Sequence, residues 1–114
     1  MTEIVNPVTA EHLIEFDGYV AKWQKRLNLM DWRIERSRRR SKTSMAEVVF
    51  NDGARLATVR VGVSFGSEPV TSASLEATAL HELLHILLHD VLAEWTEAGE
   101  HRVINLLEKL LLAQ

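Results

Sequence analysis

The chain has 114 residues, a formal net charge of -3 and no cysteine. This length predicts one domain over residues 1–114, with its own core and little room for a second module. The lack of cysteine excludes disulfides, thiol catalysis and a cysteine-based zinc ribbon. The net charge argues against an obligate nucleic-acid binder. Because the sequence contains neither a signal core nor an apolar run of membrane-spanning length, we expect a soluble, cytoplasmic protein.

The first half of the chain predicts one helix followed by three strands. The helix starts after Thr9, a suitable N-cap, and runs to about Leu27 with an apolar stripe along one side. A short strand begins at Trp32, and two more are predicted at 46–51 and 55–63, joined by an Asn-Asp-Gly hairpin turn. These patterns predict a three-stranded, mostly antiparallel sheet. The stripe consists of Leu13, Phe16, Val20, Trp23 and Leu27.

A basic run occupies residues 36–42 and holds five of the thirteen basic residues of the chain. Such a run is most often a solvated connection between strands. The functional alternative is a contact with nucleic acid or with an acidic partner. No aromatic residue is interleaved with it, so a stacking platform for bases is not expected.

Two helices are predicted in the second half. The first extends from Ser72 to Trp95 without proline or glycine, and Thr71, Ser72 and Ser74 are suitable N-caps. A closing helix begins near residues 96–100, after a turn at 93–96. Together with the sheet, the helices predict an α+β domain. The core positions expected on the two helices are Leu75, Ala79, Leu83, Ile86, Leu87 and Val91, then Val103, Ile104, Leu107, Leu110 and Leu111.

Within the first of these helices, His81, Glu82 and His85 fit the pattern H-E-x-x-H. Side chains at i and i+4 share one helix face, so both imidazoles can reach one zinc ion. Glu82 then projects beside the metal, where it can accept a proton from a bound water and pass it to a leaving group. The competing interpretation is a surface helix whose histidines are merely polar.

A zinc hydrolase needs a third protein ligand, and the closing helix offers one. Glu100 lies on the apolar face of that helix and, in an antiparallel hairpin, returns to the level of His85. We predict Glu100 as the third ligand, with Glu97, His101 and His89 as the alternatives. Glu100 can also be explained as a first-turn acid favoured by the helix dipole.

This order of elements resembles that of the minimal gluzincin-type zinc metallopeptidases, including SprT-like and ImmA/IrrE-like domains and small phage or prophage proteins. The resemblance rests on Trp32-Arg33-Ile34, on the stretch from Leu80 to His85, and on Val103-Ile104-Asn105 in the closing helix. It covers most of the chain in order, but only the His81–His85 motif is specific. The chain departs from these families by lacking a cysteine ribbon and room for a further domain.

The resemblance implies a Zn²⁺-dependent peptidase in which Glu82 acts as general base and then as general acid. His89 is the candidate donor to the transition state, ahead of His101 and Arg102, and Asp90 is a candidate to orient a ligand histidine. An extended protein or peptide substrate would lie along a sheet edge, which here suggests the strand ending near Gly62.

Two alternatives belong to other functional classes. The chain could be an inactive or regulatory binding module that keeps the zincin fold, or it could act on DNA-bound proteins through Arg38, Arg39 and Arg40. Glu82 argues against the pure binding module, because a structural zinc site does not need a base. The sequence leaves the substrate, the pathway and the oligomeric state undetermined.

Overall fold

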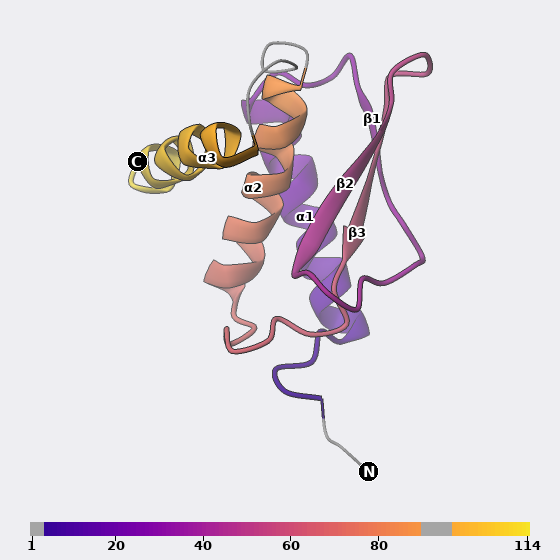
Figure 1. Cartoon of the computed structure of the whole chain (residues 1–114), viewed down its shortest axis with the longest axis vertical. Helices are drawn as coiled ribbons and strands as arrows, with labels where there is room; N and C mark the ends of the chain where they lie inside the picture. The colour runs from indigo at the N-terminus through magenta and orange to yellow at the C-terminus, as the bar shows by residue number, and fades with distance from the viewer. Residues whose placement is uncertain (1–3, 90–96) are drawn as a thin grey trace.

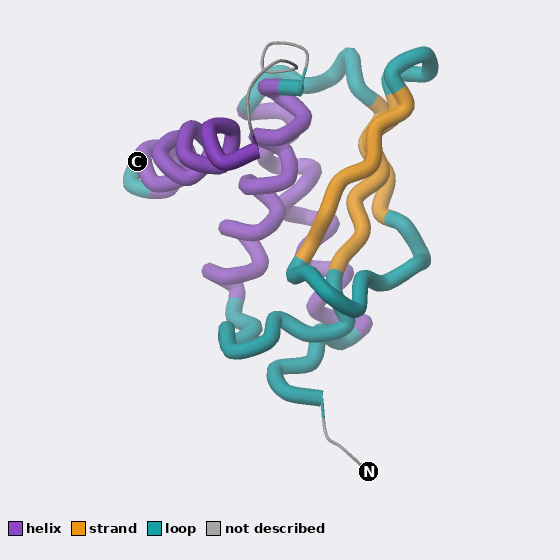
Figure 2. Tube along the Cα trace, viewed as in Figure 1, coloured by secondary structure: helices purple, strands orange, loops and turns teal. Residues whose placement is uncertain are grey.

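The computed structural model describes residues 4–89 and 97–114. Within these residues the chain forms a small α+β fold of three helices and one mixed three-stranded sheet. Figures 1 and 2 show the helices on one side of the sheet, with α1 and α2 side by side and α3 extending away from the body. The elements, in chain order, are α1 (Ala10–Arg26), β1 (Arg33–Arg36), β2 (Ala46–Asn51), β3 (Leu56–Val61), α2 (Ser72–Leu88) and α3 (Glu97–Leu112).

Helix α1 has the predicted bounds and the predicted buried stripe. Thr9 caps it by accepting a hydrogen bond from the backbone of His12, whose imidazole accepts one from Thr9 in return. Phe16 and Trp23 are buried between α1, α2 and the sheet. Asn28 follows the helix with a positive φ of 56°, a left-handed conformation that asparagine tolerates and that ends helices.

The sheet has the order β1-β3-β2, in which β2 and β3 are antiparallel and β1 is parallel to β3. The prediction of a mostly antiparallel sheet is therefore confirmed for β2 and β3 but wrong for β1 and β3. The connection after β1 crosses the position that β3 later fills, so β2 forms on the far side of it. β3 is the central strand, with Ala57, Val59 and Val61 buried. The prediction that the strand ending near Gly62 offers an edge to substrate is wrong, because β3 is paired on both sides. The edge strand beside α2 is β2.

Helix α2 lies at the centre of the fold. It contacts α1, β2 and α3, so most of its circumference is apolar and only one strip remains for polar residues. Leu80 and Leu84 are fully buried in addition to the predicted positions, whereas Leu87 is 37% exposed and was wrongly assigned to the core. Val91 and the predicted turn at 93–96 lie outside the described residues. Seven residues of α2 are buried: Leu75, Ala79, Leu80, Glu82, Leu83, Leu84 and Ile86.

Helix α3 is attached to the body much more lightly. Its one fully buried residue is Ile104, and Leu107 and Leu111 pack against the core only in part. Leu110, predicted to be buried, is 56% exposed and lies beside the equally exposed Leu106. The carboxyl-terminal half of α3 extends beyond the rest of the fold (Figure 1).

The basic run is partly built into the structure. Arg40 donates hydrogen bonds to the backbone oxygens of Val8, Val61 and Gly62, and Arg36 forms a bidentate pair with Asp17. Burial lowers the pKa of Arg40 from its usual value. Arg36 therefore connects β1 to α1, and Arg40 connects its loop to β3 and to the segment before α1, which leaves fewer basic groups for a nucleic acid. Among the described helices, none is both long enough and apolar enough to cross a membrane.

Candidate metal centre

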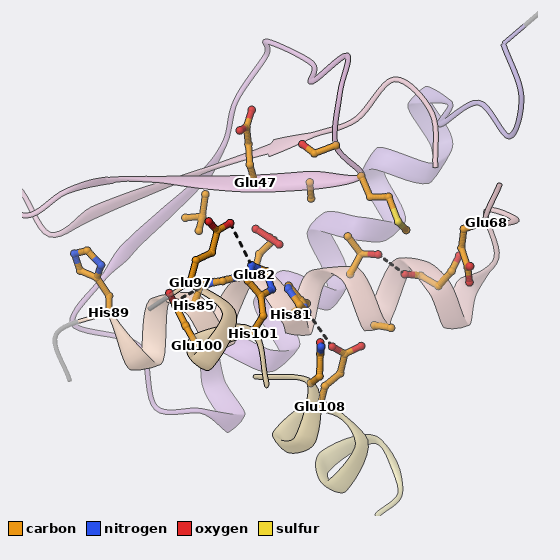
Figure 3. A pocket seen from close by; sticks show the side chains of 18 of the residues that line it. Glu47, Glu68, His81, Glu82, His85, His89, Glu97, Glu100, His101 and Glu108 are labelled. Carbon is orange, nitrogen blue, oxygen red and sulfur yellow. Dashed lines mark hydrogen bonds and ion pairs between the residues drawn. The ribbon is translucent and has the colours of Figure 1, made fainter. Parts of the chain in front are cut away.

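An open cleft of about 710 Å³ runs between α2 and the edge strand β2, with the start of α3 closing one side. The wall formed by α2 presents the polar strip of that helix, which includes Thr78, His81 and His85. The opposite wall is formed by β2 and the residues before it, from Ser44 to Phe50. The predicted motif is therefore at the centre of a cleft, where a ligand can reach it (Figure 3).

Three histidines converge in this cleft. The ring centroids of His81, His85 and His101 are 5.1, 5.4 and 5.0 Å apart, and one nitrogen from each ring lies within 4.8 Å of the others. His81 and His85 share a face of α2 because they are four residues apart, and His101 comes from the first turns of α3. Their side chains are 22, 15 and 42% exposed, so the cluster is sheltered but open to the cleft.

Two carboxylates hold two of these rings from behind. His85 Nδ1 donates to Glu100 Oε1 at 2.7 Å, and His81 Nδ1 donates to Glu108 Oε2 at 3.1 Å. Because an ionised carboxylate can only accept, the proton lies on Nδ1 of each ring. The lone pair of Nε2 is then left for another partner, such as a metal ion. The hydrogen bond to Glu108 raises the pKa of His81, whereas burial lowers the pKa of His85.

Glu82 is the third component of the site. Glu82 is only 5% exposed as a residue and lines the cleft, and no described residue hydrogen-bonds to its carboxylate. Burial raises the pKa of Glu82 to about 7. A carboxylate in so sheltered a position is costly to ionise, and proteins keep one where a metal, a proton or a ligand compensates it. Glu82 lies next to the histidine cluster in the same cleft (Figure 3).

His89 lies at the far end of the cleft and has a different set of partners. Its imidazole stacks on Phe50 with a centroid separation of 3.7 Å, and its Nε2 donates to Asp52 Oδ1 at 2.7 Å. This histidine therefore ties the end of α2 to the β2–β3 turn, so the nitrogen it would offer to a transition state is already engaged. Asp90, expected to orient a ligand histidine, lies outside the described residues.

The structure brings the predicted residues together but distributes their contacts differently. Glu100 returns to the level of His85, as predicted, but it contacts the imidazole Nδ1. The residue that joins the two motif histidines is His101, one of the alternatives for the third ligand. The remaining alternative on α3, Glu97, has a side chain that is 91% exposed and lies 3.9 Å from His101.

Glu108 is the site residue that sequence reasoning missed. It lies eight positions after Glu100, so the two acids lie on nearby faces of α3, and each reaches one ligand histidine. A search for acids on the face of the closing helix that carries His101 would have found it. The crossing of α3 over α2, which decides the pairing, comes from tertiary packing around Ile104.

The donor set fits a divalent transition metal. One nitrogen from each of His81, His85 and His101 can provide three corners of a tetrahedron and leave one position open, the arrangement of catalytic zinc sites. The two Nδ1–carboxylate contacts supply the orientation that such ligands usually receive from a second layer of residues. The unpaired carboxylate of Glu82 beside the cluster is a further reason to expect positive charge there.

Comparisons with known proteins add no assignment, since no protein-family model, no curated protein and no solved structure matches the chain.

Proposed function

We propose that the chain is a zinc-dependent hydrolase, and most specifically a small peptidase of the H-E-x-x-H type. The observation that carries the proposal is the convergence of His81, His85 and His101 beside the buried, unpaired Glu82 in an open cleft. Under this proposal His101 is the third ligand, and Glu100 orients His85 from behind. A zinc ion on these three nitrogens would act as a Lewis acid and lower the pKa of a coordinated water toward about 7.

Glu82 is the residue suited to move the proton. Burial raises the pKa of Glu82 to about 7, and a zinc ion in the cluster would lower it again, so the carboxylate can be ionised near neutral pH and take up and release a proton. It therefore serves first as the base that deprotonates the attacking water and then as the acid that protonates the leaving amine. A site that only stabilised the fold would have no use for this group, which favours an enzyme over a structural zinc module.

The edge of β2 favours an extended peptide as the substrate. Gly62 donates its N–H to the oxygen of Met45, and pairing alternates along antiparallel strands, so residues 47, 49 and 51 also face β3. The backbone groups of Ala46, Val48 and Phe50 then point away from β3, and all three residues line the cleft. A peptide could add to this edge as a further strand and place a carbonyl beside the histidine cluster.

Metal content is the first test of the proposal. Purified wild type should carry about one zinc per chain, His85→Ala and His101→Ala should lose it, and Glu100→Ala should keep it with weaker affinity. His89→Gln is the matched control and should keep full zinc binding. Loss of zinc in Glu100→Ala with full retention in His101→Ala would restore Glu100 as the ligand, and a wild type that binds no zinc would end the hydrolase proposal.

Activity is tested with the zinc-loaded protein and a mixed library of fluorogenic peptides. Glu82→Gln should retain zinc and lose hydrolysis by a factor of about 10² or more, as expected for removal of a general base. Equal hydrolysis by wild type and Glu82→Gln would show that Glu82 is not the base.

A further inference from the structure

The charged residues that line the cleft are mainly acidic. Of the nineteen described residues that line it, six are glutamates and none is lysine or arginine, although thirteen of the 114 residues in the chain are basic. Two of the six, Glu100 and Glu108, pair with histidines, and Glu82 lies buried beside them. Even with a divalent cation in the histidine cluster, the lining keeps an excess of negative charge. The six are Glu47, Glu68, Glu82, Glu97, Glu100 and Glu108.

The other three acids, Glu47, Glu68 and Glu97, lie along the length of the cleft. Glu68 is exposed near the amino-terminal end of α2, and no described residue bonds to its carboxylate. Glu97 is 91% exposed beside the histidine cluster, and its one ion pair among the described residues is the 3.9 Å approach to His101. Glu47 stands on the rim of β2, where Arg60 pairs with it at 3.1 Å. Figure 3 shows Glu68 at one end of the cleft and Glu97 over the cluster.

The dimensions of the cleft match a short extended segment. The α2 wall runs from Ser74 to His89, about 22 Å at 1.5 Å per residue. The β2 wall runs from Ser44 to Phe50, about 20 Å at 3.3 Å per residue. This length accommodates about six residues of extended chain. Glu97 would then contact a side chain next to the reacting bond, and Glu68 a side chain toward one end of the segment.

We propose that the cleft selects a basic peptide segment, in which lysine or arginine side chains are bound by Glu97 next to the scissile bond and by Glu68 toward one end of the segment. This inference rests on the proposed peptidase function and specifies its substrate. A ligand of the same sign is disfavoured, because a phosphate backbone or an acidic peptide would bring its charge against six carboxylates. Nucleic acid is for this reason a poor occupant of the cleft itself.

Binding tests the proposal separately from catalysis. Two fluorescein-labelled octapeptides are compared by fluorescence anisotropy, one with lysine at alternate positions and one with glutamine there. Zinc-loaded Glu82→Gln protein is used so that neither peptide is cut. We expect the lysine peptide to bind about tenfold more tightly, and the preference to shrink as salt is raised from low to physiological ionic strength.

Variants then locate the preference. Glu68→Gln and Glu97→Gln should each reduce it by about threefold, and the double variant should nearly abolish it. Glu11→Gln, an exposed acid on α1 outside the cleft, is the matched control and should leave it unchanged. Equal binding of the two peptides, no binding of the lysine peptide, or a preference untouched in the double variant would overturn the inference. These outcomes are independent of the proposed function, which is tested by zinc binding and by peptide hydrolysis.

Discussion

Helices α1 and α3 both pack on α2, but they are held there by different forces. α1 buries the large side chains of Phe16 and Trp23 against the core, so its attachment is mainly hydrophobic. α3 buries Ile104 alone and reaches α2 through His101, Glu100 and Glu108, which belong to the candidate metal centre. We therefore expect α1, α2 and the sheet to fold through their apolar residues. The position of α3 depends instead on polar contacts that a metal ion would complete.

The largest expected loss of stability follows from a change in the hydrophobic contacts of α1. Phe16→Ala removes a fully buried ring, so the free energy of unfolding should fall by about 3–5 kcal/mol. Because α1 does not contribute to the metal centre, the loss should be the same with and without zinc, as measured by urea unfolding. Leu106→Ala, at a residue that is 60% exposed on α3, is the control and should have little effect. A loss that zinc repairs would contradict the separation of the two helices.

Removal of zinc should loosen α3 rather than α1. Zinc at a hundred times its dissociation constant should raise the free energy of unfolding by about 2.7 kcal/mol, because it binds the folded state. Chelation should therefore reverse this gain and speed backbone hydrogen exchange in α3 more than in α1, as followed by mass spectrometry. His101→Ala should show no zinc-dependent change. Equal acceleration in α1 and α3 would show that the metal does not hold α3 specifically.

Glu108 lies on α3 and accepts a hydrogen bond from His81 on α2, so its removal tests a polar contact between these two helices. Glu108→Ala should weaken zinc binding by about 10- to 100-fold, measured by competition with a chromophoric chelator, because it removes the group that orients the ring. Glu108→Gln should be intermediate, since its amide oxygen still accepts from Nδ1. Lys109→Ala, at the next residue, is the control. Unchanged affinity in Glu108→Ala would reduce the contact to surface pairing.

The smallest expected effect concerns the polar link between α1 and α2. Glu76 accepts hydrogen bonds from Lys22 Nζ at 2.5 Å and Trp23 Nε1 at 2.9 Å, and the bond from Lys22 lowers the pKa of Glu76 below its usual 4.5. A lowered carboxyl pKa stabilises the fold above about pH 4.5, and this contribution is lost as the pH falls through the folded-state pKa. Glu76→Gln should therefore cost about 1–2 kcal/mol at pH 7.

The pH profile distinguishes this link from simple packing. In urea unfolding, the difference between Glu76→Gln and wild type should shrink between pH 5 and pH 3 as Glu76 becomes protonated. Addition of zinc at pH 7 should leave it unchanged, since Glu76 lies on the α1 side of α2. A difference of constant size down to pH 3 would mean that the charge of Glu76 contributes nothing.

The sequence alone determined the α+β class, the helix after Thr9, the two strands of the hairpin and the helix that carries His81, Glu82 and His85. These features depend on local periodicity, capping and turn chemistry, which act over a few residues. The same spacing placed both imidazoles on one helix face. The zinc ion, the peptide substrate and the role of Glu82 as a base remain predictions.

Tertiary structure decided the features that join distant segments. It made β3 the central strand and β2 the edge beside the cleft, because strand order depends on how loops cross and on which strand α2 covers. It also placed His101 in the histidine cluster and Glu100 behind His85. The sequence could not show which of these two adjacent residues would face the cluster. A rotation of α3 by about 100° exchanges these two side chains, and the packing of Ile104 into the core fixes that rotation.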